Sequence, residues 1–148
     1  MPGVRSADAT DRPAGRALEE SAERARVAAR AAESKQAIDT VILEVGDVLA
    51  IVDWFVVTSA ANPRQARTIA EEIEEQLRRH SGDGPLRVEG TDDARWILLD
   101  FGDVAVHVFL EEARAFYDLE RLWRDVARLD WGEGLGGDEA LSTQSRRR

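Results

Sequence analysis

Apolar residues recur at helical spacing in three segments of the chain. The first, 17–36, is rich in Ala, Glu and Arg and carries a weakly apolar face. The second, 62–80, opens with Asn62 and Pro63, which suit the cap and the first position of a helix, and then repeats apolar residues at three and four positions. The third, 111–128, is acidic at its start and basic at its end, as the helix dipole favours. Its apolar stripe consists of Phe116, Leu119, Leu122, Trp123 and Val126. We therefore predict a helix over each segment.

Apolar residues at alternate positions predict strands in other segments. The segment 51–59 is apolar on both faces, as in a central strand that is covered on each side. Gly102 lies between the last two strands and supplies the positive φ of a tight hairpin turn. The order α-β-β-α-β-β-β-α predicts a mixed five-stranded sheet flanked by helices, in the α/β (α+β) class. Strands are expected at 39–45, 51–59, 86–89, 95–100 and 104–110.

Both ends of the chain lack this periodicity. Residues 1–16 are small and polar with two prolines, and residues 131–148 are rich in glycine before three closing arginines. Such composition is typical of disordered tails. We therefore expect one folded domain over 17–130, which suits a chain of 148 residues.

The chain is acidic, with a net charge of −9 and a pI near 4.8. The imbalance lies in 38–128, which holds ten Arg against nineteen Asp and Glu. An acidic surface opposes binding to DNA or exposed RNA and suits a basic partner. The sequence has no apolar run long enough to span a membrane and no secretory signal, so we expect a cytoplasmic protein without a membrane partner.

The sequence has no strong catalytic or metal-binding motif. It has no Cys and two His: His80 ends a predicted helix, and His107 lies between valines of a strand, where a packed His is commoner than a catalytic one. A magnesium site for phosphoryl transfer needs paired carboxylates on one strand face, but Asp100 and Asp103 are three residues apart across a tight turn. Turn formation is the simpler role for both. We expect no catalytic residue, no metal and no cofactor.

Aromatic residues are the less ordinary feature of the chain, which contains four Trp and one Tyr. Trp54 lies in the predicted central strand and is expected in the core. Trp96 opens a strand, and Trp123 and Tyr117 lie near acidic residues of the last helix. Trp and Tyr beside charges are typical of protein interfaces, so Trp96 and Trp123 could belong to the core or to an interface.

Several long runs resemble one protein family. They are DWFVVTS at 53–59, RVEG at 87–90, RWILLDFGDVAVHVF at 95–109 and FYDLERLW at 116–123. Over roughly 22–128 the chain resembles the ribosomal silencing factor family, also called Iojap-like. The resemblance implies a small mixed α/β domain with nucleotidyltransferase-like topology and no enzymatic activity.

The resemblance also implies a function. It implies binding to the large ribosomal subunit through the fourteenth ribosomal protein of that subunit. Bound there, the protein would block joining of the small subunit and repress translation during nutrient limitation. A homodimer is implied for the free protein.

Carried over to this sequence, the resemblance implies a partner-binding surface on the hairpin strands and the start of the last helix. Trp96 would be the desolvated anchor, and the acidic residues would steer and pair with Lys or Arg of the partner. Two other hypotheses stay open: a magnesium-dependent nucleotidyltransferase-like enzyme, and a dimeric adaptor whose partner is not ribosomal. The expected partner-binding residues are Trp96, Asp100, Asp103, His107, Tyr117, Asp118 and Glu120.

Overall fold

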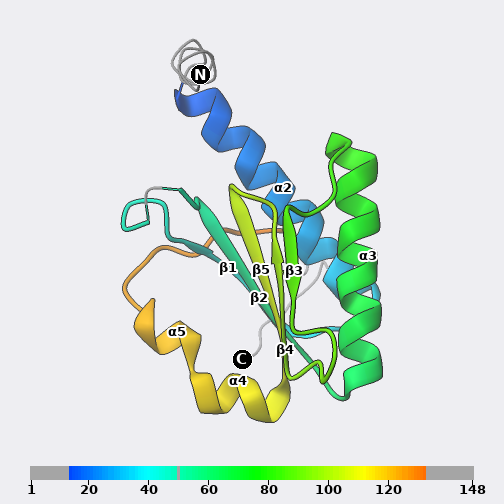
Figure 1. Ribbon diagram of the computed structural model, residues 1–148. Coiled ribbons are helices and arrows are strands. Elements are labelled where there is room, and N and C mark those ends of the chain that lie inside the picture. Colours follow the sequence, from blue (N-terminus) through cyan, green and yellow to red (C-terminus); the bar gives the residue numbers. More distant parts are fainter. Residues whose placement is uncertain (1–13, 50, 133–148) are drawn as a thin grey trace.

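The computed structural model describes residues 14–49 and 51–132. A five-stranded sheet forms its centre, with strand order β1-β2-β5-β4-β3 (Figure 1). β2 and β5 run parallel, and the other neighbouring pairs are antiparallel. Each strand overlaps its predicted segment, so the mixed five-stranded sheet is confirmed. The strands are β1 (Ile38–Glu44), β2 (Trp54–Ala60), β3 (Arg87–Glu89), β4 (Trp96–Asp100) and β5 (Val104–Leu110).

One face of the sheet is covered by α2 (Ala14–Ser34) and α3 (Pro63–Ser81), which also pack against each other (Figure 1). We call it the helix-covered face. Its side chains are mainly aliphatic: Ile97 of β4 lies beside Val108 of β5, and both are fully buried. Buried Ala residues line the inner side of α2, and their small side chains let this helix approach the sheet closely.

Local contacts define both ends of α3. Asn62 Oδ1 accepts a hydrogen bond from the backbone N–H of Gln65 at 2.8 Å, and Gln65 Oε1 accepts one from the backbone N–H of Ala61 at 2.7 Å. Gly82 closes the helix with a left-handed φ of 86° and donates its N–H to the Arg78 carbonyl. The predicted helix is therefore confirmed, with both ends capped.

The prediction of one helix over 111–128 is wrong. The chain forms α4 (Glu111–Tyr117) and the short α5 (Leu119–Leu122), separated by Asp118. Asp118 has φ 50° and ψ 51°, a left-handed conformation through which an α-helix cannot continue. Trp123, expected on the apolar stripe of that helix, lies beyond α5 and packs edge-on against Phe55 at a centroid distance of 5.6 Å. The stretch was helical in pattern, but tertiary contacts on the sheet divide it.

Residues after α5 run along β1, the edge strand of the sheet. The Leu129 N–H donates to the Ile42 carbonyl at 3.0 Å, and the Glu44 N–H donates to the Ala127 carbonyl at 2.9 Å. We call residues 123–131 the strap. The strap gives β1 hydrogen-bonding partners on its outer side, which an edge strand otherwise lacks.

The folded part reaches slightly beyond the expected domain. α2 begins at Ala14, inside the segment expected as an N-terminal tail. Trp131, expected in the C-terminal tail, is only 5% exposed and donates its indole N–H to the Thr40 carbonyl at 3.2 Å. The rest of both predicted tails, 1–13 and 133–148, lies outside the described residues. Within the described residues, no helix has the length and apolar character needed to cross a membrane.

Candidate functional site

Aromatic side chains gather on the second face of the sheet, which we call the open face because α4, α5 and the strap cover it only in part. Trp96 of β4 packs against Phe109 of β5 at a ring centroid distance of 4.9 Å and against Tyr117 of α4 at 4.8 Å. Phe55 of β2 lies 4.6 Å from the His107 ring. Trp54, in contrast, is buried against α2, which confirms its predicted place in the core.

Gly90 lets β3 and β4 approach each other at the start of β4. It has a φ of 87°, and a Cβ added there would lie 2.0 Å from the Trp96 carbonyl oxygen. No larger residue fits without moving the backbone. The position of Trp96 therefore depends on a glycine six residues before it.

His107 lies beneath Trp96 and is 7% exposed. The Trp96 indole N–H donates a hydrogen bond to His107 Nδ1 at 3.1 Å, whereas Nε2 is buried and has no hydrogen-bond partner among the described residues. Burial lowers the pKa of His107 to about 4, so the ring is neutral at physiological pH. His107 thus supports the surface from below and does not itself lie on it.

Exposed apolar side chains extend the aromatic cluster to the surface. Phe116 is 76% exposed, Tyr117 45% and Leu122 77%, and all three line one open groove along α4 and α5. Trp96 is half-buried beside Tyr117. We call Trp96, Phe116, Tyr117 and Leu122 the aromatic patch. A group of large exposed apolar residues on a charged protein is typical of an interaction site.

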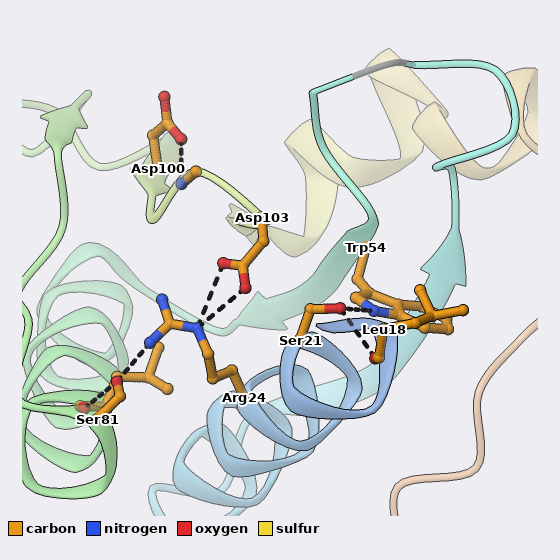
Figure 2. Close-up of polar contacts among 9 residues, drawn as sticks. Leu18, Ser21, Arg24, Trp54, Ser81, Asp100 and Asp103 are labelled. Carbon is orange, nitrogen blue, oxygen red and sulfur yellow. Dashed lines mark hydrogen bonds and ion pairs between the residues drawn. The ribbon is translucent and has the colours of Figure 1, made fainter. Parts of the chain in front are cut away.

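Asp100 and Asp103 do not belong to this patch. Asp100 accepts a hydrogen bond from the Gly102 N–H at 2.9 Å, and its other oxygen lies 3.7 Å from a guanidinium nitrogen of Arg87. Asp103 points to the other side of the hairpin, where it forms an ion pair with Arg24 of α2 at 3.2 Å (Figure 2). Both carboxylates therefore hold the turn and its neighbours in place.

Glu120 is also held by arginines of its own chain. It lies 3.0 Å from Arg114 and 3.8 Å from Arg128. Arg114, whose side chain is 12% exposed, also donates to Ser59 Oγ at 2.8 Å and to the Ile38 carbonyl at 3.3 Å. This network fastens α4 and α5 to the start of β1 and the end of β2.

Of the seven expected site residues, the structure brings together Trp96, His107 and Tyr117, and it places the exposed Asp118 next to Tyr117 in the same groove. It does not bring Asp103 or Glu120 to the surface as free carboxylates. The sequence did not indicate Phe116 and Leu122 as site residues, because both fall on the apolar stripe of the predicted unbroken helix. Among the residues that the structure describes, no group of three or more His, Asp or Glu is arranged to hold a metal ion.

Comparison with known proteins identifies the fold and the family. A family model described as "Ribosomal silencing factor during starvation" matches residues 18–148. The chain belongs to the ribosomal silencing factor family. It is 38% identical to a ribosomal silencing factor of Bacillus subtilis over 109 residues, which covers 72% of this chain and 92% of the relative. It is 35% identical to another from Halalkalibacterium halodurans over 105 residues, which covers 71% of this chain and 89% of that relative.

A solved structure agrees with this assignment. A crystal structure of a protein from Chromobacterium violaceum superposes with a TM-score of 0.66 at 29% sequence identity, covering 69% of this chain and 84% of the other. Ribosomal silencing factors are non-enzymatic regulators of translation, and membership of the family decides against the magnesium-dependent enzyme that the sequence left open.

Proposed function

We propose that this protein binds the large ribosomal subunit in the cytoplasm through the fourteenth ribosomal protein of that subunit, and that it thereby blocks joining of the small subunit and represses translation during nutrient limitation. The aromatic patch carries the proposal. In a family that silences ribosomes, a cluster of exposed aromatic and aliphatic side chains on a half-covered sheet face is the surface best suited to a protein partner.

The chemistry of the patch and its rim fits a basic ribosomal protein. Trp96 and Tyr117 offer large apolar area with a polar group at the edge, which is typical of residues that dominate binding energy. Glu111 and Glu112 are exposed in the first turn of α4, and Asp118 is exposed at its end. With Asp125 these carboxylates outnumber the two arginines that line the same groove, Arg121 and Arg124, so the rim would attract Lys and Arg of the partner and repel exposed RNA phosphates.

The proposal includes a homodimer of the free protein. Phe116 and Leu122 are more than three-quarters exposed, and a second copy would remove them from water when no ribosome is bound. One chain has a mass of 16.4 kDa, and sedimentation velocity of the free protein should give twice that mass. A single species of monomer mass at micromolar concentration would overturn the dimer but not the ribosomal function.

Cosedimentation tests the proposed mechanism directly. The full chain should pellet with isolated large subunits and bind joined ribosomes weakly, because the small subunit would cover or compete for the site. In a subunit-joining assay it should reduce the formation of joined ribosomes in proportion to its occupancy. Equal binding to both particles would contradict occlusion of the joining surface.

Two leucines provide a matched pair of variants for the patch. Leu122 and Leu86 are both 77% exposed, but Leu86 precedes β3, outside the patch. Leu122→Arg should weaken binding to large subunits about tenfold or more, since it places a large charged group in an apolar contact and repels a basic partner. Leu86→Arg makes the same charge change and should bind as the unaltered chain does. Equal affinities of the two variants would show that the patch is not the contact.

A further inference from the structure

His107 is a buried side chain of the open face. Among the described residues one of its ring nitrogens has a hydrogen-bond partner and the other has none. It lies in the middle of β5, between Val57 of β2 and Leu98 of β4 in the strand register. Its ring packs edge-on against Phe55 at 4.6 Å and lies 5.9 Å from the Trp96 ring. Because β2 and β4 flank it and the rings of Phe55 and Trp96 pack against it, the imidazole has little freedom to rotate.

The hydrogen bond with Trp96 specifies the protonation state of this imidazole. An indole N–H is only a donor, so His107 Nδ1 must be the acceptor and carries no proton. The ring is then neutral with its proton on Nε2, the atom that has no hydrogen-bond partner among the described residues. A charged imidazole would carry protons on both nitrogens and could not accept from Trp96.

Burial of the His107 Nε2–H lowers the stability of the folded protein. A buried N–H without a partner destabilises a folded protein, and an aliphatic side chain at the same position would avoid that cost. What His107 supplies, and an aliphatic residue would not, is an acceptor for the indole of a half-buried Trp in the aromatic patch.

We infer that His107 is a positioning residue, which holds the Trp96 indole in the orientation that the ribosomal partner meets. The inference rests on the proposed function of the aromatic patch. Through its bond to Nδ1, the indole is fixed before binding, so less side-chain freedom is lost when the partner docks. The imidazole itself stays below the surface and does not touch the partner.

Two nearly isosteric substitutions separate the hydrogen bond from packing. In His107→Asn the Oδ1 atom can take the place of Nδ1 and accept from Trp96, whereas His107→Leu has a similar shape and no acceptor. His107→Leu should be at least as stable as His107→Asn, because it buries no unpaired amide, yet it should bind large subunits about fivefold more weakly. If His107 had only a structural role, affinity would follow stability and His107→Leu would bind large subunits more tightly than His107→Asn. That result, or equal affinities of the two variants, would overturn the inference.

A double-mutant cycle tests whether His107 acts through Trp96. Trp96→Phe keeps an aromatic ring but removes the N–H, so adding His107→Leu to it should change affinity less than twofold. An undiminished effect of His107→Leu in this background would show that His107 acts by another route.

Nuclear magnetic resonance gives a readout that needs no binding measurement. The nitrogen shifts of the His107 ring should show an unprotonated Nδ1 and a protonated Nε2 at neutral pH. The Trp96 indole signal, one of four in the chain and assigned with Trp96→Phe, should move in His107→Leu and move less in His107→Asn. A proton on Nδ1, or an indole signal that is unchanged in His107→Leu, would overturn the inference.

The binding data also separate failure of this inference from failure of the proposed function. If Trp96→Ala binds large subunits normally while remaining folded, the aromatic patch is not the contact and the proposed site fails. If Trp96→Ala weakens binding but the Asn and Leu variants of His107 bind equally, only the positioning role fails.

Discussion

The helix-covered face and the open face of the sheet are made from the same strands but differ in side chains and in cover. Under α2 and α3 the side chains are mainly aliphatic and fully buried, as at Ile97 and Val108. On the open face they include the aromatic rings of Phe55, Trp96 and Phe109, and Trp96 is only half-buried. The contrast separates the part of the molecule that stabilises the fold from the part that is free to bind.

Two tryptophans show the same contrast at the level of one hydrogen bond. The Trp54 indole donates to Ser21 Oγ of α2 at 2.9 Å, inside the core (Figure 2). The Trp96 indole donates to His107 at 3.1 Å, at the edge of an exposed patch. In the first pair both groups are buried by the fold; in the second, one ring remains partly available to a partner. Substitutions on the helix-covered face should therefore change stability, and substitutions in the aromatic patch should change binding to large subunits.

The largest difference in stability should come from neighbouring residues of β4 that point to opposite faces. Ile97→Ala should lower the free energy of unfolding by about 2–5 kcal/mol, because it leaves a cavity under the helices. Leu98→Ala, on the half-exposed open face, should lower it by about 1 kcal/mol. Urea denaturation measures both. Equal losses would mean that the open face is as much a part of the core as the other.

Acid should destabilise the protein through His107. Its pKa falls from 6.5 to about 4 on folding because the folded state buries the ring. Below pH 6.5 the unfolded chain therefore binds a proton that the folded chain does not, and this contribution reduces stability progressively as pH falls, by about 3 kcal/mol at pH 4. Above pH 6.5 both states are neutral and the contribution vanishes.

The comparison with His107→Leu isolates this contribution from the titration of carboxylates. Its free energy of unfolding, measured by denaturant titration between pH 7 and pH 4.5, should decline less steeply than that of the unaltered chain. Parallel curves would show that His107 is not buried in its neutral form.

The smallest effect should come from the hydrogen bond on the helix-covered face. Ser21→Ala removes the acceptor of the buried Trp54 indole and should lower the free energy of unfolding by about 1 kcal/mol. It should leave affinity for large subunits unchanged, because Trp54 and Ser21 lie away from the aromatic patch. If Ser21→Ala instead weakened binding without a loss of stability, the assignment of stability to one face and of binding to the other would be wrong.

Much of the fold could be predicted because its signals are local. Alternating apolar residues mark the strands, and the Asn62 cap with Gly82 marks both ends of α3. The break at Asp118 could not be predicted in this way, since the residues on both sides of it continue a helical pattern. The break lies where both α4 and the strap contact the sheet. Because of it, Phe116 and Leu122, which the pattern places on the apolar stripe of one helix, are exposed at the surface.

The candidate site was predictable in its residue types but only partly in its geometry. Tyr117 and Asp118 were expected on a partner-binding surface and are exposed, whereas Trp96, which could have belonged to the core or to an interface, is half-buried. The sequence does not show that Asp103 faces Arg24, 79 residues earlier in the chain, because that ion pair forms only when α2 packs across the hairpin. Nor does the sequence show which ring nitrogen of His107 accepts the hydrogen bond from Trp96.

By itself, the amino-acid sequence determined the order of strands and helices, the acidic charge and the family, since these depend on local periodicity, composition and long runs of matching residues. The tertiary structure alone decided which face of the sheet stays open, which carboxylates are already paired, and that a buried neutral imidazole holds a surface tryptophan. These properties arise from the strand register and from contacts between residues far apart in the chain, which no local pattern encodes.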